Sequence, residues 1–408
     1  MKLRNRWSYA VIGVAVMLIV GMVYGWSILS APIASDFPEW SKTQLSFTFT
    51  LTMIGFCCGC LVSGALSRKV SPRGFVCMAA VMLAAGFFLT AATQNLPMLY
   101  LGFGVLGGVA GGFAYNNILC VLSAWFPDKQ GLISGILLMG FGISSFLIGK
   151  LYVRFLPEGL GGWRVVFRVL AVIALVVVLV CGLLLREPDE EDRKKLAQSS
   201  KKARKSALES STGEMIKQSS FWLYFIYAVL VSVAGLALVS QASGIAWEIG
   251  PQISAGTIAT IVGLISVFNG IGRVFFGALY DRKGYRTTIL TDFALFLAEE
   301  LLLLAAFMTG NFVLLVMGFV FGGLAYGAVT PTNSAIISDF FGRSHYAMNL
   351  SVINVTLMIA SFGSTVAGKL YDSSGSYYST IFMMLAVTIV GGLISLRIRR
   401  PGEKSHKN

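Results

Sequence analysis

Long apolar stretches alternate with short polar ones along the whole chain, and this pattern limits the folds open to it. A helix that crosses the hydrocarbon core of a bilayer needs roughly 20 apolar residues. The stretches that meet this requirement are 8–31, 43–66, 72–93, 97–125, 130–155, 164–186, 219–246, 254–281, 286–308, 312–340, 344–371 and 377–398. Only 12% of the residues are charged, against about 25% in soluble proteins. The sequence therefore predicts an all-α membrane protein with twelve transmembrane helices.

One charged segment divides these stretches into two groups of six. Residues 187–217 contain the acidic run 189–192 and the basic run 201–205, and are too polar to enter a bilayer. We predict an N-terminal six-helix bundle over 1–186, a cytoplasmic linker over 187–217 and a C-terminal six-helix bundle over 218–408. The linker is expected to be partly amphipathic and to lie near the membrane surface, either simply solvated or bound to anionic lipid.

The distribution of cations predicts the orientation in the membrane. Most of the 32 Lys and Arg lie in the N-terminal segment, the linker and the loops on that same side, and such loops are normally cytoplasmic. The first apolar stretch exceeds the roughly 7–15 residues of a signal-peptide core, so it is interpreted as an uncleaved span. We expect a monomeric, multi-pass protein of the plasma membrane, in a bacterium the inner membrane, with both termini cytoplasmic.

Several other functions are excluded. The net charge of +13 does not indicate a nucleic-acid partner, because the cations lie in short loops and form no continuous basic face. Cys57, Cys58 and Cys60 cluster without the nearby His or carboxylate that would complete a zinc site. The run Gly102–Gly107 matches a dinucleotide-binding pattern, but it lies inside an apolar helix rather than between a strand and a helix. We therefore predict no metal, no cofactor and no enzymatic activity.

The two halves repeat each other in order. The matching segments are Gly64–Lys69 with Gly277–Arg282, Gly111–Tyr115 with Gly322–Tyr326, and Gly149–Tyr152 with Gly368–Tyr371. They pair the second predicted span with the eighth, the fourth with the tenth and the fifth with the eleventh. A parallel repeat of six helices is typical of transporters whose halves rock around a site at the membrane midplane.

Several further segments add to these repeats. They are the loop Gly277–Arg286 and the segments Tyr24–Ser27, Gly102–Tyr115, Trp125–Gly131, Asn269–Arg273, Tyr326–Gly327 and Asp339–Gly342. Through Gly277–Arg286, which is similar to its loop signature, the chain resembles the major facilitator superfamily. Through the other segments it resembles more specifically the oxalate/formate antiporter and monocarboxylate porter branch. The resemblance implies the major facilitator fold, two pseudo-symmetric six-helix halves, and secondary active transport by alternating access.

The loop signature also implies a conformational latch formed by Asp281, Arg282 and Arg286. An acid near a helix N-terminus is stabilised by the helix dipole, and it can pair with its partners in one conformation only. The N-terminal copy of the signature has Ser67 where the acid is expected. A hydroxyl offers only a hydrogen bond, so the latch is expected in the C-terminal copy.

Arg273 is the main candidate for substrate binding. It is the only charged residue between Glu248 and Asp281, and eight helical residues place it about 12 Å from Asp281 along the axis, close to the midplane. An Arg there costs roughly 2.5–3.5 kcal/mol or more, which a bound carboxylate would offset through two parallel hydrogen bonds. Asn269, one turn away, can orient the guanidinium. The alternatives are snorkelling to the surface and a structural ion pair.

Polar residues in other spans are predicted to complete the site. Tyr24, Tyr115 and Tyr326 lie mid-span on Gly-rich faces, where a phenol can bind the oxygens of an acid. Asn117 and Asn354 are amides within apolar helices, where an unpaired amide is costly. The alternative is interhelical packing with a bonded hydroxyl for the three tyrosines, and a helix-to-helix hydrogen bond for the two amides.

Glu299 and Glu300 are the candidates for proton coupling, because they lie near the middle of the ninth predicted span. The alternative is that both are neutral and face a neighbouring helix. Monocarboxylate porters often carry an Asp one turn before the Arg of the eighth span, where this chain has Asn269. Their coupling scheme therefore does not transfer directly.

The count of buried cations narrows the predicted substrate. In the oxalate/formate relatives a Lys of the eleventh span helps to hold a dianion, but this chain has no Lys or Arg between Arg343 and Lys369. One positive charge suits one carboxylate, as in lactate, pyruvate or formate, carried with a proton or against a counter-anion. The alternatives are an oxalate/formate-type exchanger, a carrier of sugars or drugs, and a transporter-like sensor.

Overall fold

The computed structural model describes residues 6–22, 26–40, 42–155, 161–199 and 206–402. Within these ranges the regular elements are helices and no residue is assigned to a strand. The chain divides into two compact units. Unit 1 comprises Met1–Asp128, Ile136–Ala203 and Leu350–Val352, and unit 2 comprises Lys129–Gly135, Arg204–Asn349 and Ile353–Asn408.

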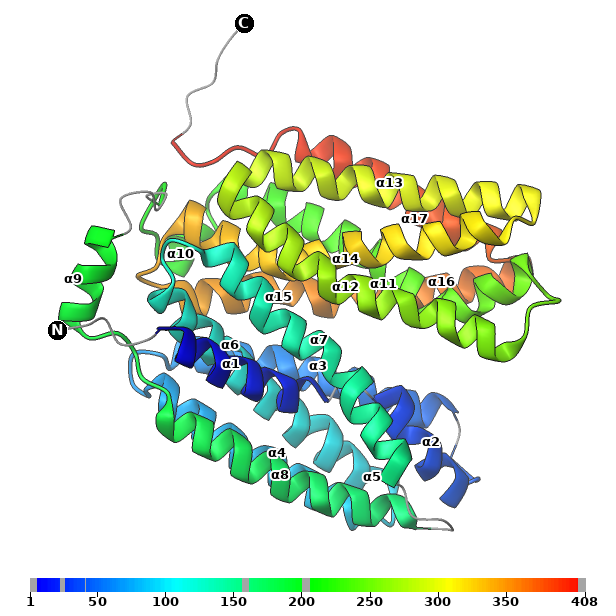
Figure 1. Cartoon of the computed structure of the whole chain (residues 1–408), viewed down its shortest axis with the longest axis horizontal. Coiled ribbons are helices and arrows are strands. Elements are labelled where there is room, and N and C mark those ends of the chain that lie inside the picture. Colours follow the sequence, from blue (N-terminus) through cyan, green and yellow to red (C-terminus); the bar gives the residue numbers. More distant parts are fainter. Residues whose placement is uncertain (1–5, 23–25, 41, 156–160, 200–205, 403–408) are drawn as a thin grey trace, which may run out of the picture. The chain divides into compact units, whose positions relative to one another are not determined.

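Unit 1 contains the helices of the N-terminal half (Figure 1). They are α1 (Arg6–Val20), α2 (Trp26–Asp36), α3 (Lys42–Ala65), α4 (Pro72–Ala91), α5 (Leu96–Leu99), the π-helical stretch η2 (Tyr100–Gly107), α6 (Gly108–Trp125), α7 (Gln130–Phe155), α8 (Gly162–Leu184) and α9 (Glu190–Ser199). Of α7, the part from Ile136 onward belongs to this unit. Sequence signals explain their starts. At α4, for example, the Ser71 hydroxyl accepts a hydrogen bond from the Gly74 N–H, and Pro72 occupies the first helical position.

Small residues let η2 and α6 pack directly on α3. A Cβ atom on Gly108 would lie 2.4 Å from the carbonyl oxygen of Thr52, and one on Gly112 would lie 2.2 Å from that of Phe56. Only glycine fits at such distances, so the backbones of the two helices are in contact. Close packing through small residues is the usual way in which helices associate in membranes.

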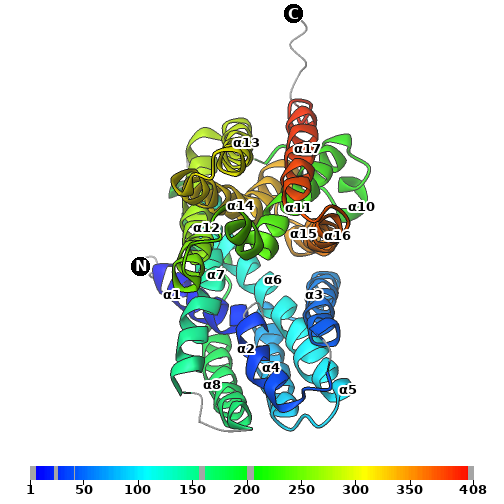
Figure 2. The same cartoon turned by 90° about the vertical axis from the view of Figure 1, so that its right-hand side faces the viewer.

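Unit 2 contains the helices of the C-terminal half. They are α10 (Thr212–Met215), α11 (Ser219–Ile249), α12 (Ala255–Lys283), α13 (Tyr285–Thr309), α14 (Phe312–Phe341), α15 (Tyr346–Ala360), α16 (Phe362–Ser374) and α17 (Tyr378–Ser395). In this unit α14 packs against α11, α12 and α13, and α17 packs against α11 and α13. Figure 2 shows these long helices almost end-on.

The predicted spans correspond to these helices, but three of them are divided. Stretch 8–31 is divided between α1 and α2, stretch 97–125 among α5, η2 and α6, and stretch 344–371 between α15 and α16 at Ser361. In the described part of the chain, 9 helices are long and apolar enough to cross a membrane, and α1 and the first part of α7 are shorter apolar helices. Helix α13 is long enough to cross a membrane but more polar than these nine, because its central part contains Asp292, Glu299 and Glu300.

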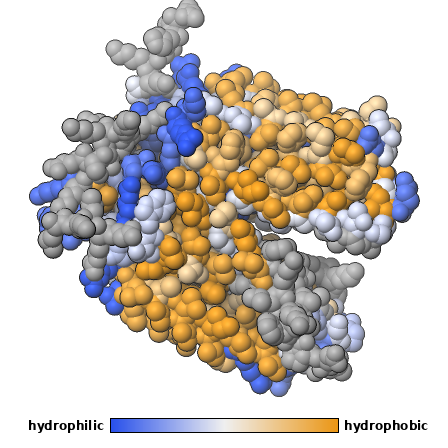
Figure 3. Space-filling view, viewed as in Figure 1, coloured by the Kyte–Doolittle hydropathy of each residue, from blue (hydrophilic) through white to orange (hydrophobic). Residues whose placement is uncertain are grey.

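The surface of the helices is apolar. In α8 the exposed face is formed by branched aliphatic residues such as Val165, Val169, Val172, Val176 and Val180. Figure 3 shows apolar residues, in orange, along the sides of the helices and hydrophilic residues, in blue, towards their ends. Such a surface is stable against lipid tails and would aggregate in water, so the helices are built to stand in a bilayer.

Candidate functional site

Arg273 lies in the second half of α12, partly buried. Helix α12 begins after Ser254, whose hydroxyl accepts a hydrogen bond from the Thr257 N–H, and it ends at Gly284, whose φ of 82° favours glycine. The Nε of Arg273 donates a hydrogen bond of 3.0 Å to the Oδ1 of Asn269, one turn earlier. This bond fixes the plane of the guanidinium, as expected from the spacing of the two residues.

The backbone around Arg273 is held by direct contact between α12 and α14. A Cβ atom on Gly272 would lie 2.3 Å from the carbonyl oxygen of Leu324, and one on Gly327 would lie 2.5 Å from that of Asn269. Because neither position has room for a side chain, the two helices touch on both sides of the Arg273–Asn269 pair. The position of the arginine is therefore set by the packing of two helices.

Tyr326 and Asn354 are also in unit 2. A Cβ atom on Gly235 of α11 would lie 2.2 Å from a ring carbon of Tyr326, so the phenol ring packs directly against that glycine. Asn354 is fully buried on α15. Tyr326 lies directly before Gly327, and the contact of Gly327 with Asn269 therefore places Tyr326 on α14 at the same level as the arginine.

Tyr115 and Asn117 are in unit 1, on α6. The Tyr115 ring is buried and makes edge contacts with Phe56 and Phe141, with ring centroids 5.1 and 5.6 Å apart. The Nδ2 of Asn117 donates a hydrogen bond of 2.8 Å to the carbonyl oxygen of Phe113 in its own helix. Tyr24 lies outside the described residues.

Asp281 is bound to the first turn of α7. Its two carboxylate oxygens accept hydrogen bonds of 2.8 Å from the backbone N–H groups of Gly131 and Leu132, which are N-terminal donors of α7 without a partner in their own helix. The residues Lys129–Gly135 belong to unit 2, as Asp281 does. A Cβ atom on Gly131 would lie 2.3 Å from the carbonyl oxygen of Gly277, so the helices meet backbone to backbone beside the carboxylate.

The backbone contact between α7 and α12 extends along α12 as far as Arg273. A Cβ atom on Gly135 would lie 2.3 Å from the carbonyl oxygen of Arg273. Of the other predicted latch residues, Arg282 is exposed, and the Nε of Arg286 donates to the Tyr285 hydroxyl at 3.0 Å. In the N-terminal copy of the signature, the Ser67 hydroxyl instead donates to the carbonyl oxygen of Gly64.

Glu299 and Glu300 are fully buried, facing other helices of unit 2. The Glu299 carboxyl group lies against Gly322 of α14, where a Cβ atom would come within 2.6 Å of its carboxyl carbon. The Oε1 of Glu300 bonds to the Thr388 hydroxyl of α17 at 2.5 Å. Neither oxygen of Glu299 has a hydrogen-bond partner among the described residues.

A third buried carboxyl group on this helix was not predicted. Asp292 is 3% exposed, and its Oδ2 accepts a hydrogen bond of 2.6 Å from the Tyr227 hydroxyl of α11. Spacings of seven and eight residues place Asp292, Glu299 and Glu300 on one side of α13, and this spacing was the available signal. Helices α11, α14 and α17 contain no Lys or Arg, and a buried carboxylate without a cation is very costly.

Comparison with known proteins agrees with this architecture. The family model of the Major Facilitator Superfamily matches residues 10–245 and 233–408. The chain is similar to the uncharacterized MFS-type transporter YhjX of Escherichia coli, with 26% identity over 88% of this chain and 86% of the relative. It is also similar to the oxalate:formate antiporter of Oxalobacter formigenes, with 26% identity over 99% of this chain and 94% of the relative.

Monocarboxylate transporter 13 of Rattus norvegicus is 23% identical over 92% of this chain and 84% of its own length. Among solved structures, the proton:xylose symporter XylE superposes with a TM-score of 0.74 at 15% identity, over 96% of this chain and 94% of that one. The predictions of the twelve-helix major facilitator fold and of a transporter rather than an enzyme are thus confirmed. The chain belongs to the major facilitator superfamily and is a multi-pass membrane protein of the secondary-transporter type.

Proposed function

We propose that this protein carries small monocarboxylates such as lactate, pyruvate or formate, and that Arg273 binds the carboxylate. The observation that supports this most directly is the anchored guanidinium. Its Nε bonds to Asn269, and the contacts of Gly272 and Gly327 hold the backbone beside it. A planar guanidinium held in this way is suited to bidentate recognition of a carboxylate.

A single carboxylate is favoured over two because α15 and α16 offer no second cation near the middle of the membrane. Lys369 lies one turn from the end of α16, and no Lys or Arg precedes it after Arg343. Two relatives, an oxalate:formate antiporter and a monocarboxylate transporter, agree by their names with a small organic anion. In this proposal Tyr24, Tyr115, Asn117, Tyr326 and Asn354 line the path of that anion.

Transport would follow alternating access, with the bonds of Asp281 to α7 as a latch for one of the two states. Bound anion neutralises Arg273 and makes it less costly to enclose. The two bundles, 1–186 and 218–408, would move about the linker 187–217. We further propose that the protein works as a monomer in a plasma membrane with both termini in the cytoplasm.

The three carboxyl groups of α13 support coupling to protons. A monocarboxylate carried with one proton moves without net charge, and this requires a group that exchanges a proton during the cycle. Asp292, Glu299 and Glu300 are buried on one side of α13, facing helices without Lys or Arg, and such a place offers no compensating charge to a carboxylate. We propose that opening of unit 2 to water lets at least one of them release its proton.

Counterflow in proteoliposomes tests the proposal. Purified protein in liposomes loaded with lactate, pyruvate or formate should accumulate the labelled acid from outside, and oxalate should compete weakly. Arg273→Gln should abolish this accumulation, whereas Lys283→Gln, which removes an exposed cation at the end of the same helix, should not. Accumulation of oxalate with no response to the three monocarboxylates would refute the proposed substrate class.

The second candidate is an exchanger of the oxalate/formate type. It is favoured by the similarity to the oxalate:formate antiporter over 99% of this chain. Strict exchange requires an anion inside the liposomes. Proton symport, in contrast, lets the acid accumulate in liposomes that contain no anion, driven by a pH gradient. Failure of all anions in counterflow, despite specific binding, would instead favour the transporter-like sensor.

A further inference from the structure

The C-terminal end of α14 is capped by the linker. The backbone N–H groups of Ala207, Leu208 and Ser210 donate to the carbonyl oxygens of Asp339, Phe340 and Phe341, at 2.8, 3.2 and 3.0 Å. These are carbonyl groups that the last turn of a helix leaves without a partner. The end of α14 is therefore a fixed point of unit 2, held by chain outside the helical bundle.

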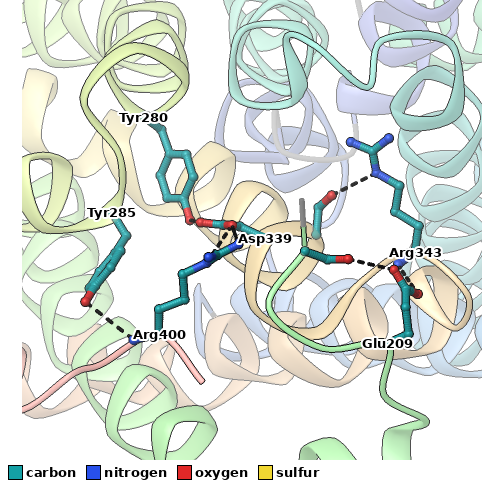
Figure 4. A network of polar contacts seen from close by, with 8 residues as sticks. Glu209, Tyr280, Tyr285, Asp339, Arg343 and Arg400 are labelled. Atoms are coloured by element: carbon teal, nitrogen blue, oxygen red, sulfur yellow. Dashed lines mark hydrogen bonds and ion pairs between the residues drawn. The ribbon is translucent and has the colours of Figure 1, made fainter. Parts of the chain in front are cut away.

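Glu209 holds the turn that follows α14. Its Oε2 accepts hydrogen bonds from the backbone N–H of Arg343 and of Ser344, each at 3.1 Å, and from the Ser344 hydroxyl at 2.7 Å. The Ser206 hydroxyl donates to its other oxygen at 2.7 Å. Figure 4 shows Glu209 reaching this turn beside Arg343. Both ends of the turn into α15 are thus fixed.

The C-terminal tail reaches the same end of α14 from the other side. Arg400 bonds to the Oδ1 of Asp339 through Nε at 3.0 Å and through Nη2 at 2.9 Å. The Asp339 side chain is only 6% exposed and that of Arg400 is 30% exposed. An ion pair with one partner buried is sensitive to loss of the other partner, because the remaining charge is left without compensation.

Asp339 also contacts α12. Its Oδ2 accepts a hydrogen bond of 3.1 Å from the hydroxyl of Tyr280, and Figure 4 shows Tyr280 and Arg400 both pointing at the carboxylate. Tyr280 directly precedes Asp281, whose carboxylate binds the N–H groups of Gly131 and Leu132. All of these residues belong to unit 2.

We propose that Arg400 of the C-terminal tail regulates the latch, acting through Asp339 and Tyr280 on Asp281. The proposal rests on the latch role given above to Asp281. With Arg400 in place, the Asp339 carboxylate is neutralised and stays buried beside Tyr280, and this holds the end of α12 against the first turn of α7. Without Arg400, the carboxylate turns towards water, Tyr280 loses its acceptor, and the hold of Asp281 on α7 weakens.

Hydrogen exchange tests this directly, because the N–H groups of Gly131 and Leu132 are the donors of the latch. Arg400→Gln, in the full-length purified protein, should speed deuterium uptake in a peptide covering residues 129–135 by roughly threefold or more. Arg399→Gln removes an exposed neighbouring cation and should leave that uptake at the wild-type rate. Asp281→Asn removes the acceptor itself and should give the largest increase.

A conservative variant tests the route without disturbing the ion pair. Tyr280→Phe keeps the ring and the Arg400–Asp339 contact but removes the hydroxyl, and it should raise uptake in the same peptide. Peptides from α4 should exchange equally in all variants, which separates the effect from unfolding. Arg400→Lys should restore most of the protection.

The proposal requires that Asp281→Asn raises deuterium uptake at residues 129–135. If it does, either of two results would overturn the proposal: uptake at the wild-type rate in Arg400→Gln, or uptake at the wild-type rate in Tyr280→Phe. If Asp281→Asn leaves uptake unchanged, the latch itself is wrong. Both measurements are made without substrate. They are therefore independent of counterflow, which decides whether the protein carries monocarboxylates.

Discussion

Arg273 is the residue on which the proposed function depends. Its guanidinium is partly buried and bonded through Nε to Asn269, so part of the proposed binding geometry is formed by the protein alone. Pre-organisation of this kind lowers the cost of ordering a side chain on binding. Asn269 is therefore expected to contribute to affinity without touching the substrate.

Asn269→Ala removes the acceptor of the Arg273 Nε. A hydrogen bond to a charged group contributes roughly 1.5–3 kcal/mol, and part of this is recovered by water, so we expect the apparent KM for the monocarboxylate to rise about tenfold. Uptake kinetics in proteoliposomes measure the change. Ile271→Ala, at an exposed position of the same helix, is the control, and an equal KM in both variants would contradict the orienting role.

At the scale of elements, glycines determine how closely the helices approach around the site. Gly272 and Gly327 join α12 to α14, and Gly131 and Gly135 join the first turns of α7 to α12. Lipid gives helices no hydrophobic reason to associate with each other, so direct backbone packing supplies much of the attraction. The linker adds a second type of contact at the end of α14, made of backbone hydrogen bonds and the Glu209 carboxylate.

Gly327→Ala places a methyl group where the carbonyl oxygen of Asn269 lies 2.5 Å away. Overpacking of this kind costs about 1–3 kcal/mol, so both Tm and counterflow should fall. Gly263→Ala on α12 has nothing within 4 Å, and it should keep or slightly raise Tm because Ala favours a helix by about 1 kcal/mol. Thermal unfolding in detergent compares the two, and equal Tm values would show that α12 and α14 are not in contact there.

The linker contact of Glu209 predicts a dependence on pH. Burial raises the pKa of this carboxyl, but the hydrogen bonds from Ser344, Ser206 and Arg343 outweigh burial and lower it below its ordinary value of 4.5. A lowered pKa in the folded state means that the stabilisation is fully present above the unfolded value and disappears as the pH falls through the folded one.

Glu209→Gln should therefore lower Tm relative to wild type at pH 7, and the difference should vanish in acid below the folded pKa. Thermal unfolding from pH 7 down to about pH 3 measures it. Glu39→Gln, at an exposed position of the other unit, should show no such convergence. A Tm difference for Glu209→Gln that stays constant with pH would contradict the assignment of the effect to the ionised carboxylate.

At the scale of the whole molecule, the proposed transport would combine a fixed anion site with a supply of protons. The anion candidate Arg273 is on α12, whereas the buried carboxyl groups are on α13, bonded to Tyr227 of α11 and Thr388 of α17. These acids are thus placed where relative movement of α11, α13 and α17 would change their access to water. Anion and proton would be coupled through that movement rather than by direct contact.

Combined Asp292→Asn, Glu299→Gln and Glu300→Gln should remove stimulation of uptake by a pH gradient. Counterflow at equal pH, which needs no net proton movement, should remain within about threefold of wild type. Each substitution should also be made singly, because a single change that removes the stimulation identifies the proton carrier. Full stimulation by the pH gradient in the triple variant would rule out these acids.

Much of this architecture is predictable from the sequence. Apolar length predicts the spans, because a bilayer admits only helices whose polar groups are satisfied internally. The division of the spans by the charged segment 187–217 stays a prediction. The break of α15 and α16 at Ser361 and the burial of Asp292 were not predicted. Both depend on contacts with other helices, which the apolar pattern of one helix does not reveal.

The sequence by itself determined the membrane helices, the family resemblance and the isolated cation at position 273, since each follows from local composition or a short motif. Only the tertiary structure decided that Asn269 anchors that cation, that Asp281 binds the N-terminal donors of α7, and that Arg400 reaches Asp339 from the tail. Such pairings join residues through the packing of helices and of chain outside them. Their partners are selected by backbone contacts at glycines and by the need to satisfy helix ends, which no single segment specifies.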